Sequence, residues 1–60
     1  MDPTQIQTFA RRLYEAEGPK AIATAAQRAL AFERNKDKEQ AQAWRRIEAA
    51  LMLIRGPRET

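Results

Sequence analysis

The chain has 60 residues, a formal net charge of +3, and neither cysteine nor histidine. This composition excludes disulfide bonds and zinc sites built from Cys and His, and a chain this short needs very regular helix packing or a partner to be stable. No stretch approaches the roughly 20 apolar residues that span a bilayer, and no signal peptide is recognisable, so we expect a cytoplasmic protein.

The first predicted helix covers residues 3–16. Asp2 before Pro3 is typical of an N-cap followed by the first helical residue, and Gln5 has the spacing of a capping box. Apolar residues then recur at steps of three and four, as on one face of a helix. The residues on this face are Ile6, Phe9, Ala10 and Leu13.

A second predicted helix, residues 19–34, follows the sequence "EGPK". Gly18 favours a left-handed turn at the end of the first helix, and Pro19 suits the first position of the next one. The expected inner face contains three alanines, which allow another helix to approach closely. Its members are Ile22, Ala25, Ala26, Ala29 and Phe32.

The segment 33–40 contains neither glycine nor proline, and one long helix through it is the alternative to a turn. Two observations favour the turn. First, the positions that would continue the inner face are polar here. Second, Asp37 and Gln40 have the same spacing as Asp2 and Gln5, which predicts a second helix start. We therefore expect a tight turn at Asn35 and Lys36.

The third predicted helix covers residues 37–55, and residues 57–60 are expected to be frayed. Its main apolar stripe is formed by Trp44, Ile47, Leu51 and Ile54, and is widened by Ala43 and Ala50. The fold class is therefore all-α, with one small domain over residues 1–60. It has three helices, of which the last two form an antiparallel hairpin.

Residues 51–54 of the third helix are all apolar, and four consecutive residues cannot all lie on one face of a helix. At 100° per residue, Ala49, Met52 and Leu53 point away from the Trp44 stripe, and Arg45 and Arg46 lie a turn earlier on the same outer face. The first helix or a second subunit could cover them. We take these five residues as a candidate interface that completes the core by homodimerisation.

The sequence contains few residues of the types that catalyse reactions. Serine, histidine and cysteine are absent, and the two glycines stand apart, so no nucleophile–base pair or phosphate loop is recognisable. Asp37 and Glu39 lack the ligand spacing of a calcium loop. We expect no enzyme activity, no cofactor or metal, and no small-molecule substrate.

The exposed arginines suggest an alternative function, a small nucleic-acid-binding regulator. Glutamates are interspersed with them, which weakens the signal. The candidate contacts are Arg11, Arg12, Arg28, Arg34, Arg45 and Arg46. In that case Trp44 could stack on a base, although its place on the apolar stripe favours a core anchor. The outer face of the last helix is too short to favour membrane binding.

From Gly18 onward, over about two thirds of the chain, the sequence resembles short uncharacterised helical proteins of alphaproteobacteria. The similar segments are "EGPKAIATAAQRAL", a polar turn with Asp37, and "AQAWRRIEAAL", in which Trp-Arg-x-Ile-x-x-Ala begins seven residues after Asp37. This chain has Lys36 where a glycine is expected. The resemblance implies a helical hairpin and no known activity. We predict a small non-catalytic interaction protein, an adaptor or regulator, that binds a second copy or another helical protein.

Overall fold

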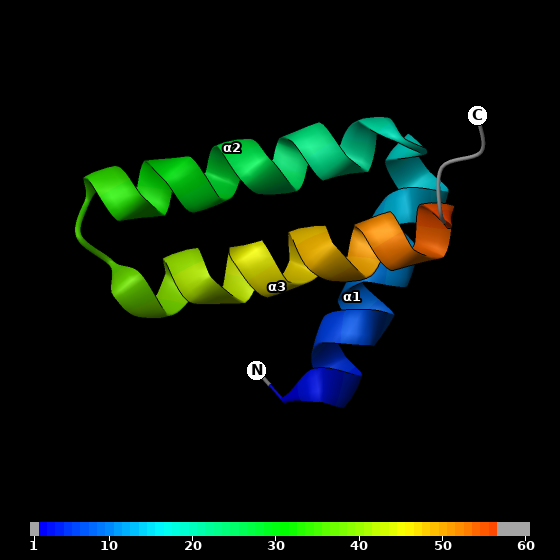
Figure 1. Cartoon of the computed structure of the whole chain (residues 1–60), viewed down its shortest axis with the longest axis horizontal. Coiled ribbons are helices and arrows are strands. Elements are labelled where there is room, and N and C mark those ends of the chain that lie inside the picture. Colours follow the sequence, from blue (N-terminus) through cyan, green and yellow to red (C-terminus); the bar gives the residue numbers. More distant parts are fainter. Residues whose placement is uncertain (1, 57–60) are drawn as a thin grey trace.

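The computed structural model describes residues 2–56, and the expectation for residues 57–60 lies outside this range. Within it the chain forms three helices, α1 (Pro3–Glu17), α2 (Lys20–Arg34) and α3 (Lys38–Arg55) (Figure 1). These bounds differ from the predicted ones by one residue at three of the six ends. The helices α2 and α3 run antiparallel and pack most closely, which confirms the all-α hairpin.

Local capping sets where α1 begins. The backbone N–H of Gln5 donates to Asp2 Oδ1 at 2.8 Å, and the N–H of Asp2 donates back to Gln5 Oε1 at 3.3 Å. This is the predicted capping box, with Pro3 at the first helical position. At the other end Gly18 has φ +70°, a conformation that side chains disfavour, so a glycine is required between α1 and α2.

The tip of the hairpin is a turn, as the sequence predicts, and not a continuous helix. The N–H of Lys36 donates to the carbonyl of Glu33 at 3.0 Å, and the N–H of Asp37 donates to that of Phe32 at 2.9 Å. This pair of bonds forms a Schellman motif, in which the residue directly after the C-cap is left-handed. Lys36 takes that left-handed position with φ +60°, where glycine is usual. Asp37 then caps α3 by accepting from the N–H of Gln40 at 3.3 Å.

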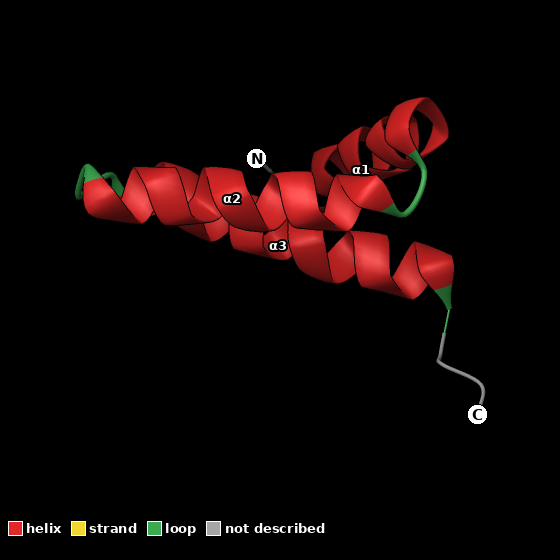
Figure 2. Cartoon of the chain, turned by 90° about the horizontal axis from the view of Figure 1, so that it is seen from above, coloured by secondary structure: helices red, strands yellow, loops and turns green. Residues whose placement is uncertain are grey.

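The helix α1 crosses one face of the hairpin near its open end, where α2 begins and α3 ends. Figure 2 shows that no helix of the described chain lies on the opposite face. The core forms where the three helices meet. Its buried members are Ile6, Ala10, Ala21, Ala25, Ile47 and Leu51.

Two features of the core differ from the sequence prediction. Ala21 and Ala41 are buried although neither was placed on an inner face. Phe9 and Ile54, both expected on inner faces, are 40% and 38% exposed. Alanine contributes little to an apolar pattern, so its burial depends on where a neighbouring helix approaches. Ile54 lies in the last turn of α3, where it shares a surface hollow with Gln7 of α1 and is only partly covered.

Candidate functional site

Three apolar residues of α3 face away from the core: Ala49, Met52 and Leu53, which together we call the outer patch. Leu53 is 78% exposed and Met52 is 48% exposed, so α1 does not cover them. Of the two alternatives that the sequence leaves open, intramolecular cover by the first helix is therefore wrong. No helix of residues 2–56 covers the patch.

Leu53 stands between two hollows in the surface. One, of about 530 Å³, is lined by Ala49, Met52, Leu53, Arg55 and Gly56. The other, of about 220 Å³, lies between α1 and α3 and is lined by Gln7, Arg11, Ala50, Leu53 and Ile54. The second hollow exists only because α1 crosses α3 here, so two helices contribute to this surface. The sequence alone did not indicate the contribution of α1.

Arg45, predicted to border the patch, is held by two carboxylates. Its Nε donates to Glu33 Oε2 on α2 at 3.3 Å, and its Nη1 donates to Glu48 Oε1 at 3.2 Å. The hydrogen bond that Arg45 donates to Glu33 is the largest cause that raises the pKa of Arg45 above its ordinary value, and the one that it donates to Glu48 is the next. The Glu48 contact is readable from the i,i+3 spacing, whereas the Glu33 contact depends on the register of the hairpin.

Arg46 lies on a different side of α3 from Arg45. It lines a different hollow, of about 310 Å³, with Ile6, Glu39, Gln40, Gln42 and Ala43, on the side of α3 that faces α1. Arg46 is exposed, and the only salt bridges among residues 2–56 are those of Arg45. The candidate interface therefore consists of the outer patch with Arg46 beside it, and Arg45 belongs to the hairpin instead.

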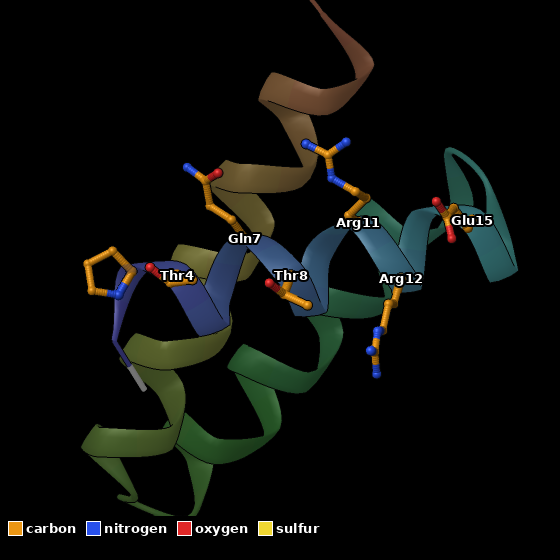
Figure 3. Close-up of a pocket in the computed structure, with 7 residues that line it drawn as sticks. Thr4, Gln7, Thr8, Arg11, Arg12 and Glu15 are labelled. Carbon is orange, nitrogen blue, oxygen red and sulfur yellow. The ribbon is translucent and has the colours of Figure 1, made fainter.

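The six arginines proposed as nucleic-acid contacts do not all lie on one surface. Arg45 is paired with glutamates, Arg28 lies over an indole ring, and Arg34 is at the far tip of the hairpin. Arg11 and Arg12 lie on α1, where they alternate with threonines and Glu15 (Figure 3). No continuous basic stripe of the kind that follows a phosphate backbone results from this arrangement.

Trp44 packs against the core, as the anchor interpretation predicts, and is half-buried. Its ring meets Phe9 edge-on, with centroids 5.5 Å apart and an interplanar angle of 88°. The Arg28 guanidinium carbon lies 5.5 Å from the centroid of the Trp44 ring, a cation–π contact. A stacking base would have to displace these neighbours, so the geometry favours the structural role.

The outer face of α1 carries a polar hollow of about 520 Å³, drawn in Figure 3. All its lining residues come from this one helix and all are exposed. They are Pro3, Thr4, Gln7, Thr8, Arg11, Arg12 and Glu15. A single helix cannot enclose a ligand, and buried polar groups that orient a substrate are not provided here. We find no reason to assign chemistry to this face.

No family model, curated protein or solved structure matches this chain. The resemblance to alphaproteobacterial hairpin proteins is therefore untested by these comparisons and stays a prediction. None of the described helices combines the length and apolar character needed to cross a membrane. Among residues 2–56, no three acidic side chains come close enough to hold a metal ion together.

Proposed function

We propose that this protein is a small non-catalytic interaction protein, an adaptor or regulator, that binds a partner protein through the outer patch on α3. The observation that carries the proposal is the 78% exposure of Leu53 beside a half-exposed Met52 at the junction of two hollows. Single exposed apolar residues are ordinary on a protein surface. Here two exposed apolar residues are adjacent, and the hollows beside them can receive apolar side chains of a partner. The scarcity of nucleophiles and bases in the sequence supports a non-catalytic role.

The proposed partner is either a second copy or another helical protein. A stable interface usually buries about 800 Å² on each partner. Ala49, Met52 and Leu53 supply only a fraction of that area, so a contact through the outer patch alone is transient, or else extends onto α1 across the hollow that contains Gln7 and Arg11. Both versions keep Leu53 at the centre of the contact.

Site-specific photocrosslinking in the native cell tests this function for either kind of partner. A photoreactive amino acid replaces Leu53, or replaces Gln27, which is exposed on α2, as the matched control. We expect a discrete crosslinked product from position 53 only, and its loss when Met52→Glu is added. A product of twice the chain mass identifies a second copy, and any other discrete protein product identifies another partner.

The same experiment distinguishes the alternatives. A product that nuclease treatment removes points to nucleic acid and contradicts an interaction with protein. Equal products from positions 53 and 27 mean that the crosslinks are non-specific and that the outer patch is not a binding surface. Circular dichroism of each variant confirms that the helices are intact before the crosslinks are compared.

A further inference from the structure

The outer patch is surrounded by positive charge. Arg55 lines the hollow on one side of Leu53, and Arg11 lines the hollow on the other side. Arg46 is exposed one turn before Ala49 and Ala50 on the same helix. None of these three arginines forms a salt bridge with another residue in the range 2–56. We call Arg11, Arg46 and Arg55 the basic rim.

The acidic residues near the patch do not neutralise this rim. Glu48, the nearest on α3, is already hydrogen-bonded to Arg45. Glu39 lines the same hollow as Arg46 without a salt bridge to it, and it precedes Leu53 by 14 residues, which is roughly 21 Å along a helix axis. Glu15 lies one turn after Arg11 on the outer face of α1 without a salt bridge to it (Figure 3). Among residues 2–56, the charge around Leu53 is therefore predominantly positive.

This charge distribution discriminates between the two kinds of partner. A two-fold dimer centred on the outer patch would bring the basic rims of both copies together, and like charges at an interface oppose binding. A partner with carboxylates around its apolar residues would instead neutralise all three guanidinium groups. Arginine also binds carboxylates with a geometry that lysine does not offer, which adds specificity.

The shape of the surface suggests a helix as the bound segment. Two apolar side chains on one helix, three or four residues apart, can enter the two hollows on either side of Leu53. Resting on the proposed function, we infer that the partner is an amphipathic helix of another protein whose apolar residues are flanked by Asp or Glu. The apolar contact supplies burial, and the basic rim selects acidic sequences.

The test uses three synthetic helical peptides of equal length with the same two leucines at i and i+4. Their flanking positions are all Glu, all Gln or all Lys. Each is titrated into the full chain labelled with ¹⁵N, and the amide signals of residues 49–56 report binding. Because three exposed ion pairs contribute to the difference, we expect the Glu peptide to bind about tenfold more tightly than the Gln peptide. Added salt should reduce this preference.

Charge reversal provides the matched comparison. In the variant Arg11→Glu, Arg46→Glu, Arg55→Glu the preference should change from the Glu peptide to the Lys peptide. The control variant Arg34→Glu, Lys36→Glu, Lys38→Glu has the same change in net charge at the tip of the hairpin and should keep the preference of the original chain. Circular dichroism checks that both variants fold.

Several results would overturn the inference. Equal affinities for the three peptides mean that charge does not select the partner, although the outer patch still binds and the proposed function stands. A dimer that is lost on Leu53→Glu assigns the surface to a second copy. Tighter binding of a DNA duplex or of phosphatidylserine vesicles at the same amides assigns it to another polyanion. No response at residues 49–56, together with no crosslink at position 53, removes the proposed function as well.

Discussion

Two leucines of α3 separated by one residue have opposite surroundings. Leu51 is 0% exposed in the core formed by the three helices, whereas Leu53 is 78% exposed on the outer patch. Two residues along a helix correspond to a rotation of 200°, so the two side chains point to opposite sides. The comparison shows that the neighbouring helices, and not residue type, decide whether an apolar side chain on α3 supports folding or remains available for a partner.

The largest expected effect comes from removing the buried leucine. Leu51→Ala should lower the free energy of unfolding by about 2–5 kcal/mol, because it leaves a cavity where three helices meet. A domain of this size has little stability in reserve, so the variant should be largely unfolded. The matched substitution Leu53→Ala should change stability by less than about 0.5 kcal/mol. Urea denaturation followed by circular dichroism measures both, and similar losses would contradict the assignment of the two faces.

Replacing an alanine by a larger residue tests the same contrast between the buried and the exposed side by adding volume. Ala25→Leu should cost about 1–3 kcal/mol, because the fully buried Ala25 side chain has no space for three more carbons. Ala49→Leu on the exposed side should be tolerated and should enlarge the outer patch. Thermal unfolding compares the two. If Ala25→Leu is as stable as the original chain, the helices are not as closely packed as the structure shows.

A smaller effect on stability is expected at the tip of the hairpin, where the turn sets how α2 and α3 pack against each other. Lys36→Gly should raise the free energy of unfolding by roughly 0.5–1 kcal/mol, since it relieves a side chain at φ +60°. The neighbouring Asn35 has φ −85°, so Asn35→Gly relieves nothing and should lower stability. Denaturation midpoints of the two variants should therefore shift in opposite directions. A shift in the same direction would mean that Lys36 does not adopt the left-handed conformation in solution.

The smallest effect on folding is expected from the pair Met52→Glu and Leu53→Glu. Both side chains are exposed, so the unfolding free energy of the isolated chain should change by less than about 0.5 kcal/mol. Partner binding, in contrast, should be lost, because the new carboxylates occupy the centre of the outer patch. Stability that falls by several kcal/mol at low protein concentration would show that these residues support the fold of the single chain.

The helices and their ends could be predicted from the sequence because their signals are local. Asp2 and Gln5 lie three residues apart, and the structure has the capping bonds that they predict. Gly18 and Pro19 mark the break between α1 and α2 as predicted, although Pro19 is the N-cap of α2 and not its first residue. The side of α3 that carries Met52 and Leu53 also followed from the helical period alone. The helical period did not show whether α1 covers that side, because this depends on where one helix crosses another.

Contacts between helices were the part that the sequence could not supply. The pairing of Arg45 with Glu33 depends on the register of α2 against α3, and the burial of Ala41 depends on how closely they approach. Arg11 was considered only as a contact for nucleic acid, and its place beside Leu53 arises from the crossing of α1 over α3. In each case the missing information is the relative position of two helices that are far apart in sequence.

The alanine-rich core has a thermodynamic consequence. Five of the eight buried hydrophobic residues in the described range are alanines, namely Ala10, Ala21, Ala25, Ala29 and Ala41. Unfolding therefore hydrates little apolar surface, and the accompanying heat-capacity change should be below the roughly 0.8 kcal/mol/K of an average chain of 60 residues. A small heat-capacity change flattens the dependence of stability on temperature. The modest stability of the protein should therefore vary little between cold and warm conditions.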